Sequence, residues 1–458
     1  MKFLTKVFFI ALSICAICHS TTAQKLSSSF HTGRREAVRE LLHDSAVAIF
    51  FSAPIRNRSN DVDFDFHQDP DFYYLTGFPQ PDAVLLVFKE FQTINGRRVN
   101  ELLFIHNRDP KKEQWLGSMM TVETASTSSG IHVVYYSSSF DTLHLNFNSL
   151  SLLMVKKQYG LVNNKSDTLD LYDLNRMIRE KFGLKDSLEN GGLKRIMAGL
   201  REVKLPEELS LLRKAISISS SAHNEMMRYT QPGLSEYHTQ AVGEYIFKRD
   251  GAESIGYSSI CGAGKNGCIL HYTMNRSPLL KNELLLLDMG AEYLGYTADL
   301  TRTIPVTGQF TPEQKTIYQL VYDAQEAAFR MCAPGNAFKD PHNAAVKVIK
   351  EGLLHLGIIQ KEEEYIIYFP HGTSHYLGLD VHDAGTKNEL KPGNVITIEP
   401  GIYIPEGSKC DPKWWNIGIR IEDDVLILID GFENLSKDCP RKIPEIEALM
   451  KEKSFLNK

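Results

Sequence analysis

The stretch from Leu284 to Thr303 places two acidic residues where a folded chain should be dry. Four leucines in LLLLDMGAEYLGYTADLTRT predict a buried strand, yet Asp288 ends that run and Asp299 follows it after a glycine-containing turn. Burying an ionised carboxylate is costly unless a metal ion or a cationic side chain neutralises it. The fold must therefore bring a cationic partner to these two acids.

Two further acids end apolar runs nearer the end of the chain. Glu399 follows VITI and Glu422 follows IRI, and the alternating isoleucines place each glutamate in a half-buried sheet. In YTADLTRT, positions 297, 299, 301 and 303 would share one polar face. A single such acid has ordinary explanations: a turn cap, an ion pair of Asp299 with Arg302, or exposure to solvent. Three longer runs each predict a strand: GYTADLTRTIPV, NVITIEPGIYI and IGIRIEDDVLILID.

As a set, the four acids predict a metal centre. If they converge in a sheet interior, they repel each other and raise each other's pKa values unless cations intervene. Two divalent ions a few ångströms apart, with some carboxylates bridging them and one imidazole completing the set, resolve this repulsion. Oxygen-rich ligation with a single histidine suits Mn²⁺, Co²⁺ or Zn²⁺.

Imidazoles are concentrated in the segment HGTSHYLGLDVHDAG. It contains His371, His375 and His382, and its glycines permit tight turns that direct the three rings into one cleft. A lone histidine is more often structural, whereas a triplet separated by glycines favours a functional site. A fourth candidate, His271, ends the apolar run in NGCILHYTMN.

Length and charge limit the class of protein. A chain of 458 residues predicts two or three units, and 43% hydrophobic with 23% charged residues is a globular composition. The formal net charge of −5 argues against nucleic acid or an anionic membrane surface as a partner.

Residues 1–23 predict a signal peptide. Lys2 and Lys6 precede the apolar run VFFIALSICAIC, and HSTTAQ supplies small residues for cleavage after Ala23. We therefore expect an exported protein, periplasmic or secreted, with no membrane attachment after processing; a membrane anchor is the alternative. The five remaining cysteines form no CxxC pair, which predicts buried thiols with at most one or two disulfides.

Two units are expected to follow the leader. The first begins with a helix over 34–42 and a buried strand over 45–54, a pattern that favours an α/β unit. A new unit is expected to begin between Arg201 and Pro206, because Pro206 and the two acids after it suit the first turn of a helix. This second unit groups helices and antiparallel strands in blocks, which favours α+β, and one helix begins with a capping box at 311–314.

Four motifs together resemble one family of metallopeptidases. The segments HGTSHYLGLDVHD, DMGAEYLGYTADLTRT, TIEPGIYI and GIRIEDD are similar to the catalytic domain of the pita-bread metallopeptidases related to methionine aminopeptidase. NGCILHYTMN and the two-unit length narrow the resemblance to the Xaa-Pro aminopeptidases, also called aminopeptidase P, and FHQDPDFYYLTGF and NRDPKKEQWLG extend it into the first half. The resemblance implies an α+β fold with a creatinase-like α/β domain over 24–200 and a pita-bread catalytic domain over 201–458.

The resemblance also implies five metal ligands on two divalent ions per chain. Asp299 and Glu422 would bridge both ions. Asp288 would bind one ion, and His375 and Glu399 would bind the other. A hydroxide between the ions would be the nucleophile, and Glu399 would handle its proton. Mn²⁺ is the expected metal, with Zn²⁺ or Co²⁺ as alternatives.

Further residues match positions around the metals. Three histidines would hydrogen-bond the scissile carbonyl, the tetrahedral intermediate and the proline side of the substrate: His271, His371 and His382. Arg420 would orient an acidic ligand.

Trp115 matches an aromatic residue that reaches towards a neighbour's active site in oligomeric relatives; a packed tryptophan is the alternative. Met274 departs from the pattern, since relatives often carry an acid there.

The implied activity is release of the N-terminal residue from peptides with proline in the second position. A homo-oligomer, dimer or tetramer, is expected. A prolidase-type dipeptidase, which cleaves only Xaa-Pro dipeptides, uses the same ligands and is the nearest alternative. A creatinase-like hydrolase or a non-catalytic binding protein is more remote, because those relatives have lost metal ligands that are all present here.

Overall fold

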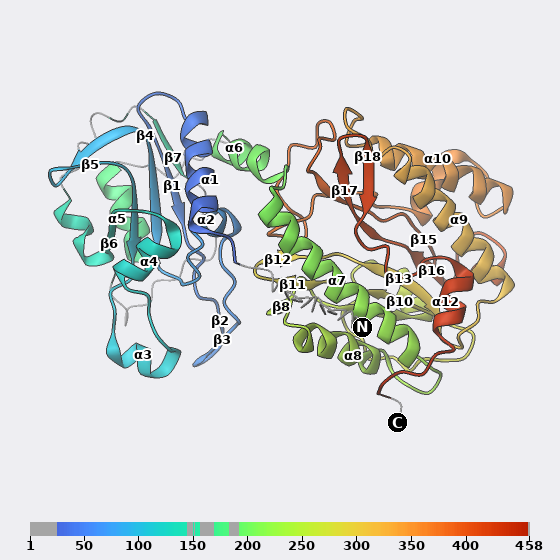
Figure 1. The fold of residues 1–458 in the computed structure, drawn as a ribbon. Helices are drawn as coiled ribbons and strands as arrows, with labels where there is room; N and C mark the ends of the chain where they lie inside the picture. Colours follow the sequence, from blue (N-terminus) through green and yellow to red (C-terminus); the bar gives the residue numbers. More distant parts are fainter. Residues whose placement is uncertain (1–24, 144–149, 151, 156–168, 183–191, 457–458) are drawn as a thin grey trace, which may run out of the picture.

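The computed structural model describes residues 25–143, 150, 152–155, 169–182 and 192–456. It contains a smaller unit, coloured blue to green, beside a larger unit, coloured green to red (Figure 1). The predicted signal peptide, residues 1–23, lies outside the described residues. Among the helices that the structure describes, none has both the length and the hydropathy of a membrane-spanning segment.

The first unit is built on a mixed five-stranded sheet. Its strands, in the order β6-β5-β4-β1-β7, are β1 (Ala46–Phe51), β4 (Val84–Ile94), β5 (Arg97–Ile105), β6 (Val134–Tyr136) and β7 (Leu152–Val155). β1 is buried along its whole length, pairs antiparallel with β4 and parallel with β7, and confirms the strand predicted over 45–54. A separate hairpin consists of β2 (Asn57–Ser59) and β3 (Val62–Asp63).

Helices cover both faces of this sheet. The helices of this unit are α1 (Ser28–Leu41), α2 (Pro70–Thr76), α3 (Pro110–Leu116), α4 (Val122–Ser129), α5 (Leu171–Phe182) and α6 (Gly192–Arg201), of which α3 has no buried residue. Because side chains alternate along a strand, Ala48 and Phe50 of β1 join a cluster with α1, α2 and α6, whereas Val47 and Ile49 join another with α5. α1 begins earlier than predicted because the Ser27 hydroxyl accepts a hydrogen bond from the Phe30 amide at 3.1 Å.

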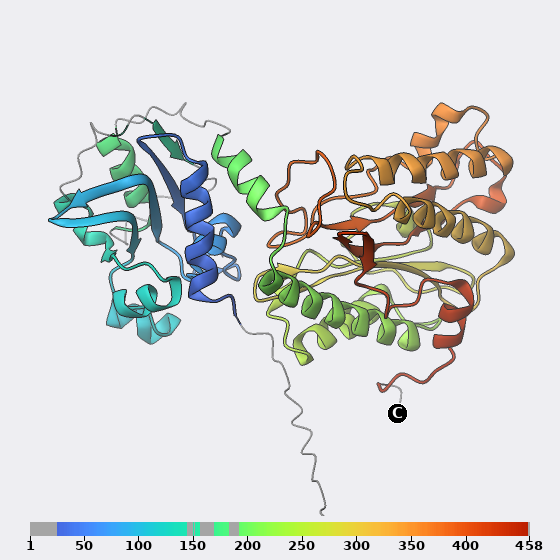
Figure 2. The same cartoon turned by 45° about the horizontal axis from the view of Figure 1, so that its top comes forward.

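The second unit has helices on two sides of its strands. α7 (Pro206–Tyr229) and α8 (Glu236–Arg249) lie on one side, and α9 (Pro312–Phe329) and α10 (Asp340–His355) on the other (Figure 2). Two shorter helices are α11 (Tyr365–Tyr368) and α12 (Ile443–Leu449). The predicted capping box is confirmed: Thr311 Oγ1 accepts from the Gln314 amide, and Gln314 Oε1 accepts from the Thr311 amide at 2.9 Å.

The strands of the second unit are short and every pair is antiparallel, as expected. One sheet, in the order β13-β10-β9, consists of β9 (Ile260–Ala263), β10 (Leu284–Asp288) and β13 (Thr301–Pro305). A second, β12-β11-β8, consists of β8 (Ser254–Ile255), β11 (Ala291–Tyr293) and β12 (Tyr296–Thr297). The others are β14 (Val395–Ile398) with β17 (Asp423–Leu428) and β18 (Gly431–Asn434), and β15 (Gly401–Ile404) with β16 (Ile417–Arg420).

Three predicted strands are each broken at an acidic residue. Asp299 lies between β12 and β13, Glu399 between β14 and β15, and Glu422 between β16 and β17. In each case the two halves pair in different sheets. The prediction that Asp299 lies within one continuous strand is therefore wrong, because the chain leaves one sheet for another at that residue. These breaks free the acids from regular pairing while Asp299 and Glu422 stay buried and Glu399 partly buried.

The two units share a core and a buried ion cluster. One hydrophobic cluster joins residues of α1, α2 and β1 to Tyr296, Leu377 and Val395 of the second unit. Next to it, four buried charges connect the units, and we call them the junction cluster: Asp71, Arg201, Lys204 and Asp383. Arg201 donates to Asp71 at 2.7 Å and to Asp383, and Lys204 donates to Asp383 at 2.9 Å.

The five cysteines in the described residues are all free. Cys261, Cys332 and Cys439 are buried, as the sequence predicts for thiols in a core. The sequence permitted one or two disulfides, but the described residues form none.

Candidate metal centre

Asp288 and Asp299 meet beneath a tyrosine. Asp288 is the last residue of β10, and Asp299 begins the approach to β13, the strand that pairs with β10. The hydroxyl of Tyr257 lies 2.6 Å from Asp288 Oδ1 and 2.6 Å from Asp299 Oδ1. Both carboxylates are buried, and the shared contact with Tyr257 places Asp288 and Asp299 in one site.

His375 and a third acid, Glu422, lie next to Asp299. Possible ligand atoms of Asp299, His375 and Glu422 all lie within 4.8 Å of one another. His375 Nδ1 lies 3.1 Å from the carbonyl oxygen of Tyr376, to which it donates, so Nε2 remains an acceptor. This Nε2 faces Asp299 Oδ2 at 3.3 Å and Glu399 Oε1 at 3.6 Å. Acceptors that face acceptors need a cation between them.

Backbone pairing positions Glu399 and His375. The Thr397 amide donates to the His375 carbonyl at 3.0 Å, and the Glu399 amide donates to the Thr373 carbonyl at 2.9 Å. The Glu422 amide donates to the Thr301 carbonyl at 3.1 Å, and the Thr301 hydroxyl donates to Glu422 Oε2 at 2.7 Å. Main-chain hydrogen bonds next to the strand breaks thus fix the positions of Glu399 and Glu422.

The carboxyl groups carry more negative charge than their surroundings neutralise. Burial, and then Glu422, raise the pKa of Glu399 to about 8. Burial, and then Asp288, raise the pKa of Asp299 well above its usual range, and burial with Asp299 does the same to the pKa of Glu422. Asp424, whose Oδ2 accepts from the Asp299 amide at 3.2 Å, also has a pKa raised by burial and Asp299.

One arginine links the acids to a histidine. Arg420 donates to Asp288, to the Thr301 hydroxyl at 3.2 Å and to the Tyr403 hydroxyl at 2.9 Å. Tyr403 lies 2.8 Å from His371 Nε2, and His371 Nδ1 lies 2.7 Å from the Gly372 carbonyl. Donation therefore runs from Arg420 through Tyr403 and His371 to the main chain.

The remaining predicted residues line the same cavity. It has a volume of about 880 Å³ and includes all five predicted ligands together with His271, His371, His382 and Arg420. The ring of His382 packs edge-on against that of His375, with 4.5 Å between centroids. Burial and Arg420 lower the pKa of His371 to about 4, and burial and His375 lower the pKa of His382. These two imidazoles are therefore neutral at pH 7.

The sequence did not identify three residues of the site: Tyr257 and Thr301, which contact the acids, and Tyr403, which contacts Arg420 and His371. Thr301 and Tyr403 had a signal, because Thr301 lies on the polar face predicted around Asp299, and Tyr403 lies within the motif TIEPGIYI. Tyr257 lies outside every motif, and its role emerges only where the fold places its hydroxyl over both aspartates.

The residues present fit divalent metal ions. Several carboxylates and one imidazole nitrogen converge within a buried cavity, and their charges are matched by Arg420 alone among the arginines and lysines that donate hydrogen bonds to these acids in the described chain. Cations relieve the repulsion that raises the carboxyl pKa values. Oxygen ligands with a single histidine nitrogen suit hard or borderline divalent ions.

Comparison with known proteins gives the same result along the chain. Residues 210–428 match the model of metallopeptidase family M24, and residues 31–150 match the N-terminal domain of aminopeptidase P. The Xaa-Pro aminopeptidase of Escherichia coli K12 is 35% identical over 431 residues, which cover 91% of this chain and 96% of that protein.

Solved structures of aminopeptidases are similar to this chain across both of its units. The aminopeptidase PepP of Pseudomonas aeruginosa superposes with a TM-score of 0.81 at 35% identity and covers 93% of this chain and 98% of that one. Aminopeptidase P from E. coli with the inhibitor Pro-Leu gives a TM-score of 0.80 at 33% identity, covering 93% and 99%. The chain is therefore a metallopeptidase that belongs to the Xaa-Pro aminopeptidase family.

Proposed function

We propose that this chain removes the N-terminal residue from peptides that have proline in the second position. The observation that supports this most directly is the convergence of the five candidate ligands and three further imidazoles in one cavity. The family relationship supplies the substrate class, since the related proteins are Xaa-Pro aminopeptidases and one relative binds Pro-Leu.

The metal-binding residues in this proposal are Asp288, Asp299, His375, Glu399 and Glu422. When bound, two divalent ions supply a hydroxide nucleophile at neutral pH and polarise the scissile carbonyl. Glu399 would accept the proton of the attacking water and later pass it to the leaving amine. Arg420 and Tyr257 hold Asp288 in place.

The neutral imidazoles orient the substrate. Because His382 and His371 are uncharged at pH 7, they can contact the peptide without adding to the charge of the site. His271 lines the cavity from a different loop, so the peptide lies between it and the His371–His382 segment. This enclosure selects a short, extended N-terminus.

A peptide panel tests the substrate. Arg-Pro-Pro should release free arginine, whereas Arg-Ala-Pro should be cleaved at least about tenfold more slowly, the effect of about 1.4 kcal/mol in the transition state. The dipeptide Gly-Pro distinguishes the prolidase alternative: activity confined to Gly-Pro would overturn the proposal. The creatinase-like alternative has no support in the comparisons.

We propose Mn²⁺ as the resident metal, with two ions per chain. Carboxylate oxygens dominate the ligand set, and such a set favours Mn²⁺ over softer ions. Metal-free protein should regain most activity with Mn²⁺, and plasma mass spectrometry should find about two ions per active chain. Greater recovery with Zn²⁺ or Co²⁺ at matched occupancy would contradict this assignment.

We further propose a homo-oligomer. Trp115 and Leu116 of α3 are 86% and 75% exposed, so Trp115 is not packed within its own chain. Large apolar side chains exposed together mark interaction surfaces. Light scattering should give a dimer or tetramer mass, and Trp115→Ala should shift it towards the monomer; a monomeric wild-type protein would refute the proposal.

We also propose that the protein is exported through residues 1–23. The support is the order of positive, apolar and small residues in that segment. Intact mass of the natural protein should correspond to a chain beginning at Gln24. A mature chain that retains the leader would contradict export by cleavage.

A further inference from the structure

His271 lies in a loop whose position must come from its two ends. The loop leaves η3 (Gly264–Cys268) and returns at Ser277, and residues 269–274 belong to no helix or strand. His271, Thr273 and Met274 are exposed to solvent. Leu270 and Tyr272, on either side of His271, are partly buried and pack against a small apolar cluster. Hydrogen bonds at the two ends of the loop add to this limited packing in fixing where the His271 ring lies.

We propose that Glu236 is a positioning residue that holds the His271 loop at the active-site cavity. Glu236 is the first residue of α8 and is fully buried. The inference rests on the proposed peptidase function, because it concerns a residue of that same site. Glu236 itself is absent from the lining of the cavity, so it acts through the loop.

Four donors from both ends of the loop converge on the Glu236 carboxylate. On the incoming side, Oε1 accepts from the Ala263 amide and from Asn266 Nδ2, each at 2.8 Å. On the outgoing side, Oε2 accepts from the Tyr272 hydroxyl at 2.9 Å and from the Ser277 amide at 2.8 Å. Tyr272 is the neighbour of His271, so one of these bonds fixes the adjacent residue directly.

The main chain reinforces the same connection. The Glu236 amide donates to the Ser277 carbonyl at 3.0 Å, so Glu236 and Ser277 are joined through both main chain and side chain. Asn266 Nδ2 also donates to the Ser277 hydroxyl at 2.8 Å, which ties the two ends of the loop together. A second anchor, Asn275, accepts from the Cys261 amide at 3.0 Å and donates to the Ser259 carbonyl at 2.8 Å.

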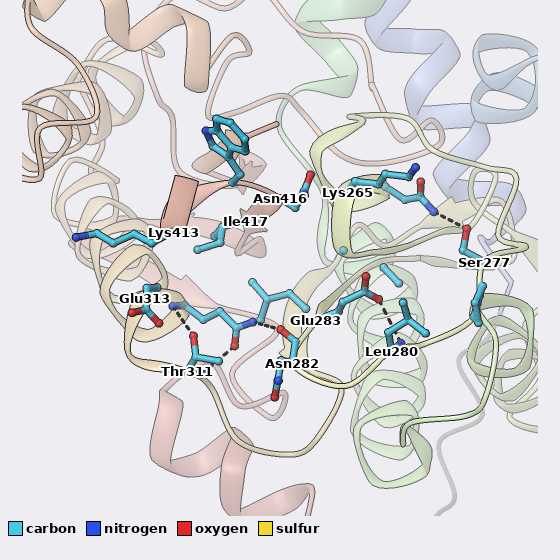
Figure 3. A pocket seen from close by; sticks show the side chains of 17 residues that line it. Lys265, Ser277, Leu280, Asn282, Glu283, Thr311, Glu313, Lys413, Asn416 and Ile417 are labelled. Carbon is cyan, nitrogen blue, oxygen red and sulfur yellow. Dashed lines mark hydrogen bonds between the residues drawn. The ribbon is translucent and has the colours of Figure 1, made fainter. Parts of the chain in front are cut away.

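Open space behind the loop makes these bonds necessary. A cavity of about 560 Å³, separate from the metal centre, is lined by Lys265, Asn266, Ser277 and Pro278. Figure 3 shows Lys265 and Ser277 at one side of this cavity, with a dashed hydrogen bond at the Ser277 hydroxyl. The loop ends that face this cavity are joined to each other by the carboxylate of Glu236.

Glu236→Gln tests the inference with the least change in shape. The carboxamide replaces one acceptor oxygen with an NH₂ group, which then faces donors that it cannot satisfy. We expect kcat for Arg-Pro-Pro to fall on the order of 10- to 100-fold, since a misplacement of about 1 Å can cost 100-fold. Metal content should stay at the wild-type value. A kcat within about twofold of wild type would overturn the inference.

A double-mutant cycle separates positioning from a general structural role. In a His271→Ala background, Glu236→Gln should change kcat by less than about twofold, because the residue it positions is gone. An equal loss in both backgrounds would overturn the inference. Glu225→Gln is the matched control: Glu225 is also buried and accepts a main-chain hydrogen bond, from Phe455 at 2.9 Å, and its kcat should equal that of wild type.

A milder variant keeps the test valid if Glu236→Gln does not fold. Tyr272→Phe removes one of the four donors and should lower kcat a few-fold, again only when His271 is present. Wild-type protein that fails to cleave any Xaa-Pro peptide would refute the proposed function. Wild-type cleavage with no coupling between residue 271 and either Glu236→Gln or Tyr272→Phe would refute the positioning role alone.

Discussion

The metal centre and the junction cluster are both buried and both contain acids, yet they balance charge differently. The junction cluster pairs Asp71 and Asp383 with Arg201 and Lys204. The metal centre sets four acids against Arg420. Accordingly, burial and neighbouring acids raise the pKa values of Asp299, Glu399 and Glu422. In the junction cluster, burial alone would lower the pKa of Arg201, but Asp383 and Asp71 raise it well above normal.

This difference separates a site built for a ligand from a site built for the fold. A cluster that balances its own charges is complete without any other molecule. A cluster with surplus negative charge is stable only with added cations or protons. Surplus buried charge is therefore the better indicator of function.

Asp299→Asn should have the largest effect, and its two consequences should have opposite signs. Activity should fall at least about 1000-fold, because several kcal/mol of charge stabilisation are lost and each 1.4 kcal/mol is about tenfold. The metal-free variant should nevertheless be more stable than metal-free wild type at about pH 8, because one repelling charge is gone. Peptide cleavage measures the loss of activity, and urea unfolding after chelation measures the stability of the metal-free proteins. Retained activity, or a less stable metal-free variant, would contradict the surplus charge.

Arg201→Ala should destabilise the protein by about 3–5 kcal/mol, because it leaves two buried carboxylates without their shared partner. This change in the free energy of unfolding has the opposite sign to that expected for metal-free Asp299→Asn, although both substitutions remove one buried charged group. Urea unfolding of the metal-free proteins gives the comparison directly. A loss below about 1 kcal/mol would show that the junction cluster is not a structural ion network.

Glu208→Gln should change the pH dependence of stability. Burial raises the pKa of Glu208 from 4.5 to about 7, so its contribution to stability is complete below about pH 4.5 and is lost as the pH rises through 7. Glutamine can still accept from the Leu205 amide and contact the Tyr296 hydroxyl, the two partners of Glu208. At about pH 8.5 the variant should be more stable than wild type by on the order of 2–3 kcal/mol, with the difference vanishing near pH 4.5. A difference that is independent of pH would refute this.

Arg213→Ala should have the smallest effect. Arg213 pairs with Glu433 at the surface, with 45% of its side chain exposed. Exposed pairs contribute about 0–1 kcal/mol, and salt screens them. Urea unfolding at low and high salt measures this contribution, and a loss as large as that of Arg201→Ala would remove the contrast between exposed and buried pairs.

The chemistry of the site could be predicted because its acids contradict their surroundings. Asp288 after four leucines is a local conflict that any reader of the sequence can find. The same holds for the capping box at Thr311, which involves residues three positions apart. Signals of this kind lie within one segment, and the structure confirms the helix start and the antiparallel strands that they predicted.

Other features had no local signal. The alternation of isoleucines continues across Glu399, so the sequence does not reveal that the two sides of the break pair in different sheets. Arg201 and Asp383 are 182 positions apart, and Glu236 and Tyr272 are 36 positions apart, so only the folded chain brings them together. In the sequence, nothing distinguishes Tyr257 from other tyrosines; only the fold places its hydroxyl beside two aspartates.

The hydrophobic cluster shared by the two units restricts how a substrate can enter. A hinge that swung the units apart would divide this cluster and expose side chains of α1 and α2 in one unit and Tyr296, Leu377 and Val395 in the other. Each large apolar side chain costs about 1.5–3 kcal/mol to expose, so such an opening is too rare to occur in every catalytic cycle. A peptide therefore enters the open cavity while the two units stay joined through this cluster.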